Sequence, residues 1–156
     1  MQVYADNAAT TKMSKVAIDA MLPYFDNIYG NPSSLYTMGQ VAKEALDAAR
    51  KTVADCLGCE PREIIFTSGG SEADNQAIIS AARYGERKGK KHIISTAFEH
   101  HAVLHTLNKL EKEGFEITLL DVRCGHNITA QQVKDAIRPD TCLVTAMYAN
   151  NETSQD

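Results

Sequence analysis

The stretch from Glu63 to Asn75 constrains the fold more than any other part of the chain. Residues 64–67 form a short apolar run of β-branched and aromatic residues, which predicts a buried strand. The run ends at Ser68-Gly69-Gly70, where glycine permits positive φ and lets the backbone lie close to a ligand. Apolar residues then recur at helical spacing and predict a helix with one apolar face, formed by Ala73, Ala77, Ala81 and Tyr84. The stretch therefore predicts a strand, a glycine turn and a helix.

The start of this helix is a candidate anion site. The first N–H groups of a helix have no partner within it, and the helix dipole makes that end partly positive. Ser71 lies where its hydroxyl and N–H would meet a phosphate oxygen. In the alternative reading, Ser68 or Ser71 only caps the helix and Asp74 favours its first turn. The residues match neither a Walker loop nor the dinucleotide G-x-G-x-x-G spacing, so both readings stay open.

The rest of the chain alternates between strand and helix patterns. Three further apolar runs predict strands, over His92–Thr96, Glu116–Val122 and Cys142–Ala149. Amphipathic patterns predict helices from Ser14 onward, over residues 35–57 up to Gly58, over residues 103–110 before Gly114, and over residues 128–137 with Thr129 as cap. This alternation predicts an α/β fold, with a mostly parallel sheet covered by helices.

Polar clusters follow the predicted strands, where ligands of parallel sheets bind. They are Ser68–Ser71, Glu99-His100-His101 and Asn150-Asn151-Glu152. Carboxyl ends of parallel strands share one edge of the sheet, so the clusters should converge. Their convergence predicts one site with a phosphate binder, an imidazole and an amide.

Composition narrows the classes of function. The chain has 156 residues, is 44% hydrophobic and carries a net charge of −4, which suits a domain with a core. Charges are interspersed, so no basic block indicates a nucleic-acid or membrane partner.

No signal peptide or long apolar stretch is evident, and we expect a cytoplasmic protein with reduced cysteines. Zinc takes about four ligands, so Cys56 and Cys59, with Cys124 and His126, are a poor metal set and we expect no metal.

Five motifs in order resemble the cysteine desulfurases of the NifS/IscS type, from Val3 to Glu152. These are pyridoxal-phosphate (PLP) enzymes of the class V aminotransferase group with fold type I. The motifs are Tyr4-Ala5-Asp6-Asn7-Ala8-Ala9-Thr10-Thr11, Gly30-Asn31-Pro32-Ser33-Ser34, residues 66–75, Glu99-His100 and Ala149-Asn150-Asn151-Glu152. The resemblance implies the first part of the large domain of that fold.

The resemblance also implies residue roles. Gly70 and Ser71 match the pair that binds the PLP phosphate. His100 matches the histidine that stacks on the pyridine ring and takes part in proton transfer. Asn151 matches the amide near the 3′ oxygen of the cofactor, with Asn150 in that role if the register shifts by one. Residues 7–10 and 31–34 resemble segments that line the substrate side of the cleft.

The implied reaction removes sulfur from L-cysteine, giving alanine and an enzyme persulfide. The sulfur then passes to an acceptor protein for iron–sulfur cluster assembly or other biosynthesis. The resemblance implies a homodimer or a complementing C-terminal chain. The family's Schiff-base Lys, pyridine-nitrogen Asp and loop Cys match no residue here. We therefore expect an arm, helix and loop over residues 1–34, an incomplete PLP-binding large domain over residues 35–156, and an inactive chain when alone.

Two alternatives differ in function class. One is a non-catalytic remnant that binds an anion or a partner, because a sheet ended early exposes edges that recruit another chain. The other keeps the fold but changes the chemistry, as in a related PLP lyase or aminotransferase. The His100 position and the Asn-Asn-Glu triplet favour the desulfurase.

Overall fold

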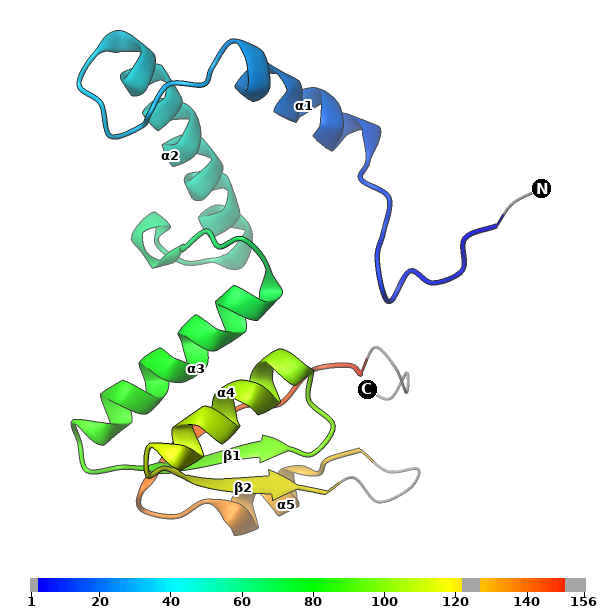
Figure 1. The fold of residues 1–156 in the computed structure, drawn as a ribbon, viewed down its shortest axis with the longest axis vertical. Helices are drawn as coiled ribbons and strands as arrows, with labels where there is room; N and C mark the ends of the chain where they lie inside the picture. The colour runs from blue at the N-terminus through cyan, green and yellow to red at the C-terminus, as the bar shows by residue number, and fades with distance from the viewer. Residues whose placement is uncertain (1–2, 122–126, 151–156) are drawn as a thin grey trace. The chain divides into compact units, whose positions relative to one another are not determined.

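The computed structural model describes residues 3–121 and 127–150. The chain divides into two compact units, residues 1–66 and residues 67–156 (Figure 1). The predicted division between an N-terminal segment, residues 1–34, and an incomplete large domain, residues 35–156, stays a prediction.

Two helices form most of the N-terminal unit. Helix α1 spans Lys15–Asp26, which confirms the helix predicted from Ser14 onward. Ser14 is its N-cap, and Ser14 Oγ accepts the N–H of Ala17 at 3.2 Å. Pro23 lies inside α1, which nonetheless continues to Asp26. Helix α2 spans Thr37–Leu57 and ends at Gly58, whose φ of 70° is the left-handed conformation expected of a glycine C-cap.

Glycines let the loop before α2 lie directly on that helix. A Cβ added at Gly39 would lie 2.6 Å from the carbonyl oxygen of Ser34, and one at Gly30 would collide with the carbonyl oxygen of Met38. Within the loop, Asn31 Oδ1 accepts the N–H of Ser33 at 2.9 Å. The Gly-Asn-Pro-Ser-Ser segment is therefore a fixed turn packed on the start of α2.

The C-terminal unit is a parallel α/β sheet, as the sequence predicts. Its elements are α3 (Gly70–Glu86), β1 (His92–Thr96), α4 (His101–Lys112), β2 (Glu116–Leu120), α5 (Ala130–Ala136) and β3 (Thr141–Val144). The strand order is β2-β1-β3, with both pairings parallel. Figure 1 shows α3 and α4 on one side of the sheet and α5 on the other. Right-handed crossovers in opposite directions across the sheet place α4 and α5 on opposite faces.

The core of this unit lies between the sheet and the pair α3–α4. It comprises seven buried residues: Ile78, Ala82, Ile93, Val103, Leu107, Leu110 and Phe115. The three α4 members are those expected from its amphipathic pattern. Helix α4 ends before Gly114, whose φ of 92° favours glycine.

The strand predicted over residues 64–67 is wrong. These residues follow a 3-10 turn, Pro61–Glu63, and pair with no strand among the described residues. Ile65 is 64% exposed and Phe66 is 48% exposed. An apolar β-branched run becomes a strand only where another strand supplies hydrogen bonds, and here none does. Instead, the guanidinium of Arg50 lies 5.0 Å from the centre of the Phe66 ring.

The apolar face predicted for α3 is also wrong. The buried positions are Ile78, Ala82 and Gly85, whereas Tyr84 is 60% exposed. Small alanines have little surface to bury, so the larger Ile78 decides which face turns inward. Gly85 then lets the helix approach β3, since an added Cβ would meet Cys142 Sγ at 2.8 Å. Strand β3 stops at Val144, short of the predicted Ala149.

A buried histidine joins all three strands at the amino end of the sheet. His92 on β1 has no exposed surface. Its Nδ1 lies 2.7 Å from Thr141 Oγ1 on β3, and its Nε2 lies 2.8 Å from Thr118 Oγ1 on β2. Burial, with Arg138 adding to it, lowers the pKa of His92 below its ordinary value. The imidazole is therefore held neutral between two hydroxyls.

His92 should make stability depend on pH. An unfolded imidazole titrates near pH 6.5, so between that value and the lower folded pKa the unfolded chain binds more protons. The contribution of His92 is full above about pH 6.5 and is lost as pH falls through the folded pKa. Urea unfolding at pH 7.5 and pH 5.5 should show a smaller loss on acidification for His92→Gln than for the wild type. An equal loss in both proteins would contradict the assignment.

Gly85→Ala should destabilise the C-terminal unit. The new Cβ collides with Cys142, and such overpacking costs about 1–3 kcal/mol. Alanine regains about 1 kcal/mol of helix propensity, so the clash prevails. Gly70→Ala in the same helix is the matched control, because no atom lies within 4 Å of its added Cβ. Urea unfolding should give a lower midpoint for Gly85→Ala only; equal midpoints would show that α3 and β3 are not in close contact.

Candidate functional site

The start of α3 presents uncapped backbone N–H groups. Gly69 is its N-cap and, being glycine, has no side chain that could accept a hydrogen bond from these N–H groups. The first helical bond runs from the N–H of Ala73 to the carbonyl oxygen of Gly69 at 3.1 Å, and the N–H groups of Gly70, Ser71 and Glu72 have no acceptor among the described residues. Apart from neighbouring residues of the chain and the helix backbone itself, no atom of the described residues lies within 4 Å of a Cβ added at Gly69 or Gly70. The helix end is therefore open to an anion.

The glycines open this end without the positive φ predicted from the sequence. Gly69 has a φ of 166°, which is extended backbone, and Gly70 is not among the positive-φ glycines. Gly69 and Gly70 matter here because they carry no side chains that would cover the N–H groups.

Ser68 does not cap the helix, contrary to the alternative reading. Its N–H and its hydroxyl both donate to Glu72 Oε2 at 2.6 Å. These hydrogen bonds, the hydroxyl first, lower the pKa of Glu72. The ionised carboxylate offsets part of the positive end of the helix. Ser71 makes no hydrogen bond with any described residue, so both its hydroxyl and its N–H remain available.

His100 stands at the start of the next helix. It is the N-cap of α4, and its Nδ1 accepts the N–H of Ala102 at 3.1 Å. Because Nδ1 is an acceptor, the neutral ring carries its proton on Nε2. The exposed ring is therefore oriented by the helix cap, with Nε2 as the atom left for a ligand.

A buried carboxyl ties the segment after β3 to the segment after β1. Glu99 is 8% exposed, and its Oε1 accepts both the hydroxyl of Thr96 at 2.7 Å and the N–H of Met147 at 2.8 Å. Asn150 Nδ2 donates to the carbonyl oxygen of Phe98 at 2.8 Å. The predicted meeting of these two clusters is confirmed for Asn150, whereas Asn151 and Glu152 lie outside the described residues. Sequence reasoning gave Glu99 no role, although a carboxylate directly after a buried strand was the available signal.

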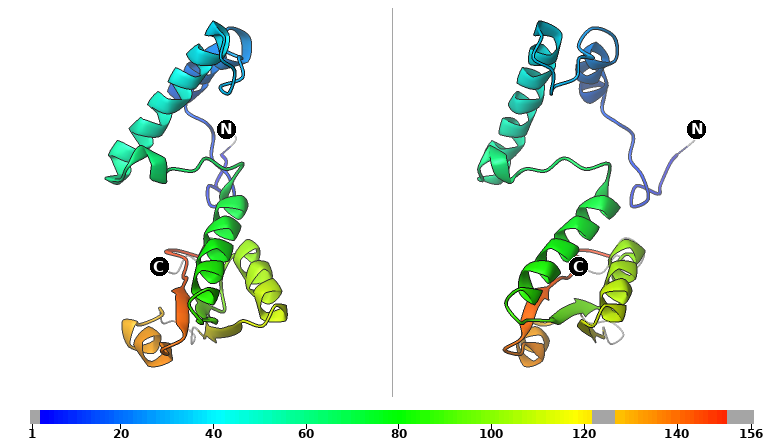
Figure 2. Two further views of the ribbon diagram at one scale, coloured as in Figure 1. Left: turned by 90° about the vertical axis from the view of Figure 1, so that its left-hand side faces the viewer. Right: turned by 60° about the vertical axis from the view of Figure 1, so that its left-hand side comes forward.

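The first cluster lies at the same end of the unit. Helices α3 and α4 run side by side, and Thr106 Oγ1 on α4 donates to Asn75 Oδ1 on α3 at 2.5 Å. Figures 1 and 2 show the N-terminal ends of both helices at the end where the strand arrows point. Gly70, Ser71 and His100 are thus brought to one end. Asn151, predicted near the cofactor, lies outside the described residues.

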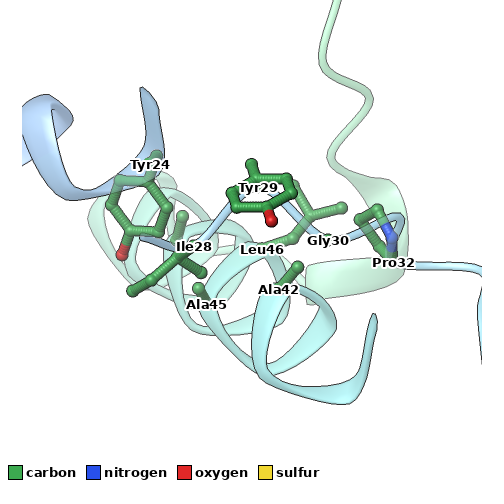
Figure 3. Close-up of a pocket in the computed structure, with 9 residues that line it drawn as sticks. Tyr24, Ile28, Tyr29, Gly30, Pro32, Ala42, Ala45 and Leu46 are labelled. Atoms are coloured by element: carbon green, nitrogen blue, oxygen red, sulfur yellow. The ribbon is translucent and has the colours of Figure 1, made fainter. Parts of the chain in front are cut away.

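The N-terminal unit holds a separate apolar groove of about 500 Å³. Figure 3 shows Tyr24, Ile28 and Tyr29 over the small side chains Ala42 and Ala45 of α2. Gly30 and Pro32 also line it, but none of the predicted cofactor-binding residues does. The substrate-side roles of residues 7–10 and 31–34, which belong to this unit, stay predictions.

The described residues contain no group of three His, Cys, Asp or Glu side chains placed to hold a metal ion. Cys124 and His126 lie outside them. Cys56, Cys59 and Cys142 are free thiols. Burial raises the pKa of Cys142, which makes it a poor nucleophile. In the same described ranges, no helix has both the length and the hydropathy needed to cross a bilayer.

A parallel α/β unit with an open helix N-terminus and an imidazole at one end is typical of phosphate-bearing cofactor sites. The chain belongs to the aminotransferase class-V family, which matches residues 3–155. Members of this family typically use PLP.

Named relatives are cysteine desulfurases. The chain is 51% identical over 150 residues to cysteine desulfurase IscS of Methanosarcina thermophila, covering 96% of this chain and 37% of that protein. It is 48% identical over 151 residues to cysteine desulfurase IscS of Clostridium botulinum (strain Hall), covering 97% and 38%. A solved NifS-like protein matches with a TM-score of 0.91 and 37% identity, covering 97% of this chain and 42% of that one. The chain thus spans about two fifths of the length of these relatives.

Removing the Glu99 carboxyl should loosen the end of the sheet. Glu99→Ala leaves the Met147 N–H and the Thr96 hydroxyl without their acceptor, at a cost of about 1–3 kcal/mol. Glu99→Gln keeps an oxygen acceptor and should retain most of the stability. Hydrogen exchange at the Met147 amide should accelerate in Glu99→Ala and much less in Glu99→Gln. Unchanged exchange in both variants would mean that Glu99 does not hold this segment.

Proposed function

We propose that this chain carries the phosphate-binding and ring-binding part of a PLP-dependent cysteine desulfurase. The observation that supports it most is the open N-terminus of α3 at the same end of the unit as His100. Identity of about half the residues to cysteine desulfurases, over nearly the whole chain, supports the same chemistry.

The chain's residues fit the cofactor. The N–H groups of Gly70 and Ser71, with the Ser71 hydroxyl, would hold the phosphate, because a dianion suits uncompensated N–H groups at a positive helix end. The His100 ring would lie against the pyridine ring. Asn151 would hold the 3′ oxygen. When bound, PLP supplies an electron sink that weakens bonds at the carbon it activates.

His100 would also move a proton. Its Nδ1 accepts the Ala102 N–H, so Nε2 is the atom that exchanges a proton with substrate. Imidazole suits this work because it titrates near neutral pH. Met147 and Asn150, fixed to residues 98–99, would keep the second wall of the site at a constant position.

In the whole protein, the proposed reaction converts L-cysteine to alanine and leaves its sulfur as an enzyme persulfide. An acceptor protein would take that sulfur for iron–sulfur cluster assembly or other biosynthesis, in the cytoplasm. We propose a homodimer, or pairing with a complementing C-terminal chain. The 156 residues alone should bind PLP without consuming cysteine, since no Lys among them matches the family's cofactor-linked Lys.

PLP titration of the 156-residue chain, followed by absorbance, tests the proposal. We expect saturable binding that borohydride does not make covalent, and no release of sulfide or alanine from cysteine. Ser71→Ala should weaken binding by roughly tenfold, the worth of one hydrogen bond to a charged group. His100→Ala should weaken it by roughly two- to tenfold, the worth of one stacking contact between rings.

Two matched variants control for unspecific effects. Ser80→Ala removes a hydroxyl from the exposed face of the same helix, and His105→Ala removes an exposed imidazole from α4. Both should bind PLP like the wild type. Saturable binding unaffected by Ser71→Ala and His100→Ala would place PLP elsewhere. Absence of binding in a folded wild-type chain would favour the non-catalytic alternative, and turnover of another amino acid by the whole protein would favour a related lyase or aminotransferase.

A further inference from the structure

Two histidines on α4 take no part in the proposed cofactor site. His101 and His105 are four residues apart, so they lie one above the other on one helix face. Their rings are stacked, with centroids 5.9 Å apart and planes 30° apart. Both side chains are exposed, and neither makes a hydrogen bond or ion pair with any described residue. None of the four ring nitrogens therefore has a hydrogen-bond partner among the described residues.

The backbone that carries the pair is held in place. The opposite face of α4 buries Val103, Thr106, Leu107 and Leu110 against the core. Thr106, which directly follows His105 in the sequence, is also hydrogen-bonded to Asn75 of α3. Sites on packed helices keep their ligands at fixed spacing, so little order is lost when both rings take one ion.

Imidazole nitrogens at this spacing suit a divalent transition metal. Nickel, copper and zinc take imidazole readily, whereas magnesium and calcium prefer oxygen ligands. Two rings fill two coordination positions, and water completes the rest. We propose that His101 and His105 form a two-histidine site for a divalent transition-metal ion on the exposed face of α4.

Three features limit its strength. There are two protein ligands rather than the four of a structural zinc site. The positive end of the helix dipole disfavours a cation in the first turn. Lys109 follows one turn after His105 on the same face. His100 adds no third ligand through Nδ1, which caps the helix, although its ring centroid lies 6.4 Å from that of His101. The site should therefore bind metal reversibly.

Nickel titration of the 156-residue chain by calorimetry tests the site, and the test does not depend on PLP. Ni²⁺ is the probe because it binds imidazole without oxidising the free thiols. We expect one Ni²⁺ per chain. His105→Asn should weaken binding roughly tenfold or more, since the second ligand no longer acts at the high effective concentration of a chelate.

The decisive control keeps the number of histidines and changes only their spacing. His105→Asn combined with Asn108→His places the second ring seven residues from His101, about 10 Å along the helix axis, too far for one ion. Asn108 is exposed, so the double variant should fold normally, and circular dichroism checks this. Binding by the double variant equal to the wild type, or no Ni²⁺ binding by the wild type, would overturn the proposal.

Discussion

Strand β1 lies between β2 and β3 with all five of its side chains buried, and the C-terminal unit is arranged around that burial. Buried polar groups cost free energy unless they find partners inside the protein. Ser95 Oγ on this strand has none among the described residues, but two other polar side chains of β1 do. His92 finds threonine hydroxyls on both neighbouring strands, and Thr96 finds the carboxyl of Glu99. The first set fixes the register at the amino end of the sheet. The second fixes the chain just beyond the carboxyl end, where His100 begins α4.

This arrangement explains why the candidate site sits where it does. Parallel strands joined by right-handed crossovers send every following helix back from the same edge. Helix α4 therefore begins at the carboxyl end of β1. Helix α3 follows no strand, but it packs beside α4, so its uncapped N–H groups lie at the same end of the unit as the imidazole of His100. Glu99 contributes by holding the segment that returns after β3. The position of the site therefore follows largely from the common direction of the strands, and side chains such as Glu99 hold the surrounding segments in place.

The sequence predicted much of this arrangement, for identifiable reasons. Helix α4, strand β1 and the start of strand β2 have patterns that local chemistry decides, and their predicted positions are confirmed, although β2 ends at Leu120. The strand predicted over residues 64–67 does not form because a strand needs a partner strand, and the sequence of these four residues does not show whether one is present. The prediction of the buried face of α3 failed because burying an alanine changes the free energy little. Ile78 and Gly85 determine the buried face instead, through contacts with residues distant in sequence. The His92 bridge was unpredictable because Thr118 and Thr141 reach it only through tertiary structure, and Asn151 lies outside the described residues.

The His92 bridge also bears on the order in which the sheet assembles. Its two threonine partners are 26 and 49 residues away along the chain. Closing the longer loop costs about 0.6 kcal/mol more, by the logarithmic dependence on loop length. The parallel β1–α4–β2 unit therefore has the smaller cost of loop closure, and we expect it to form before β3 joins the sheet. On this expectation, the hydrogen bond between His92 and Thr141 forms only when β3 has joined the sheet.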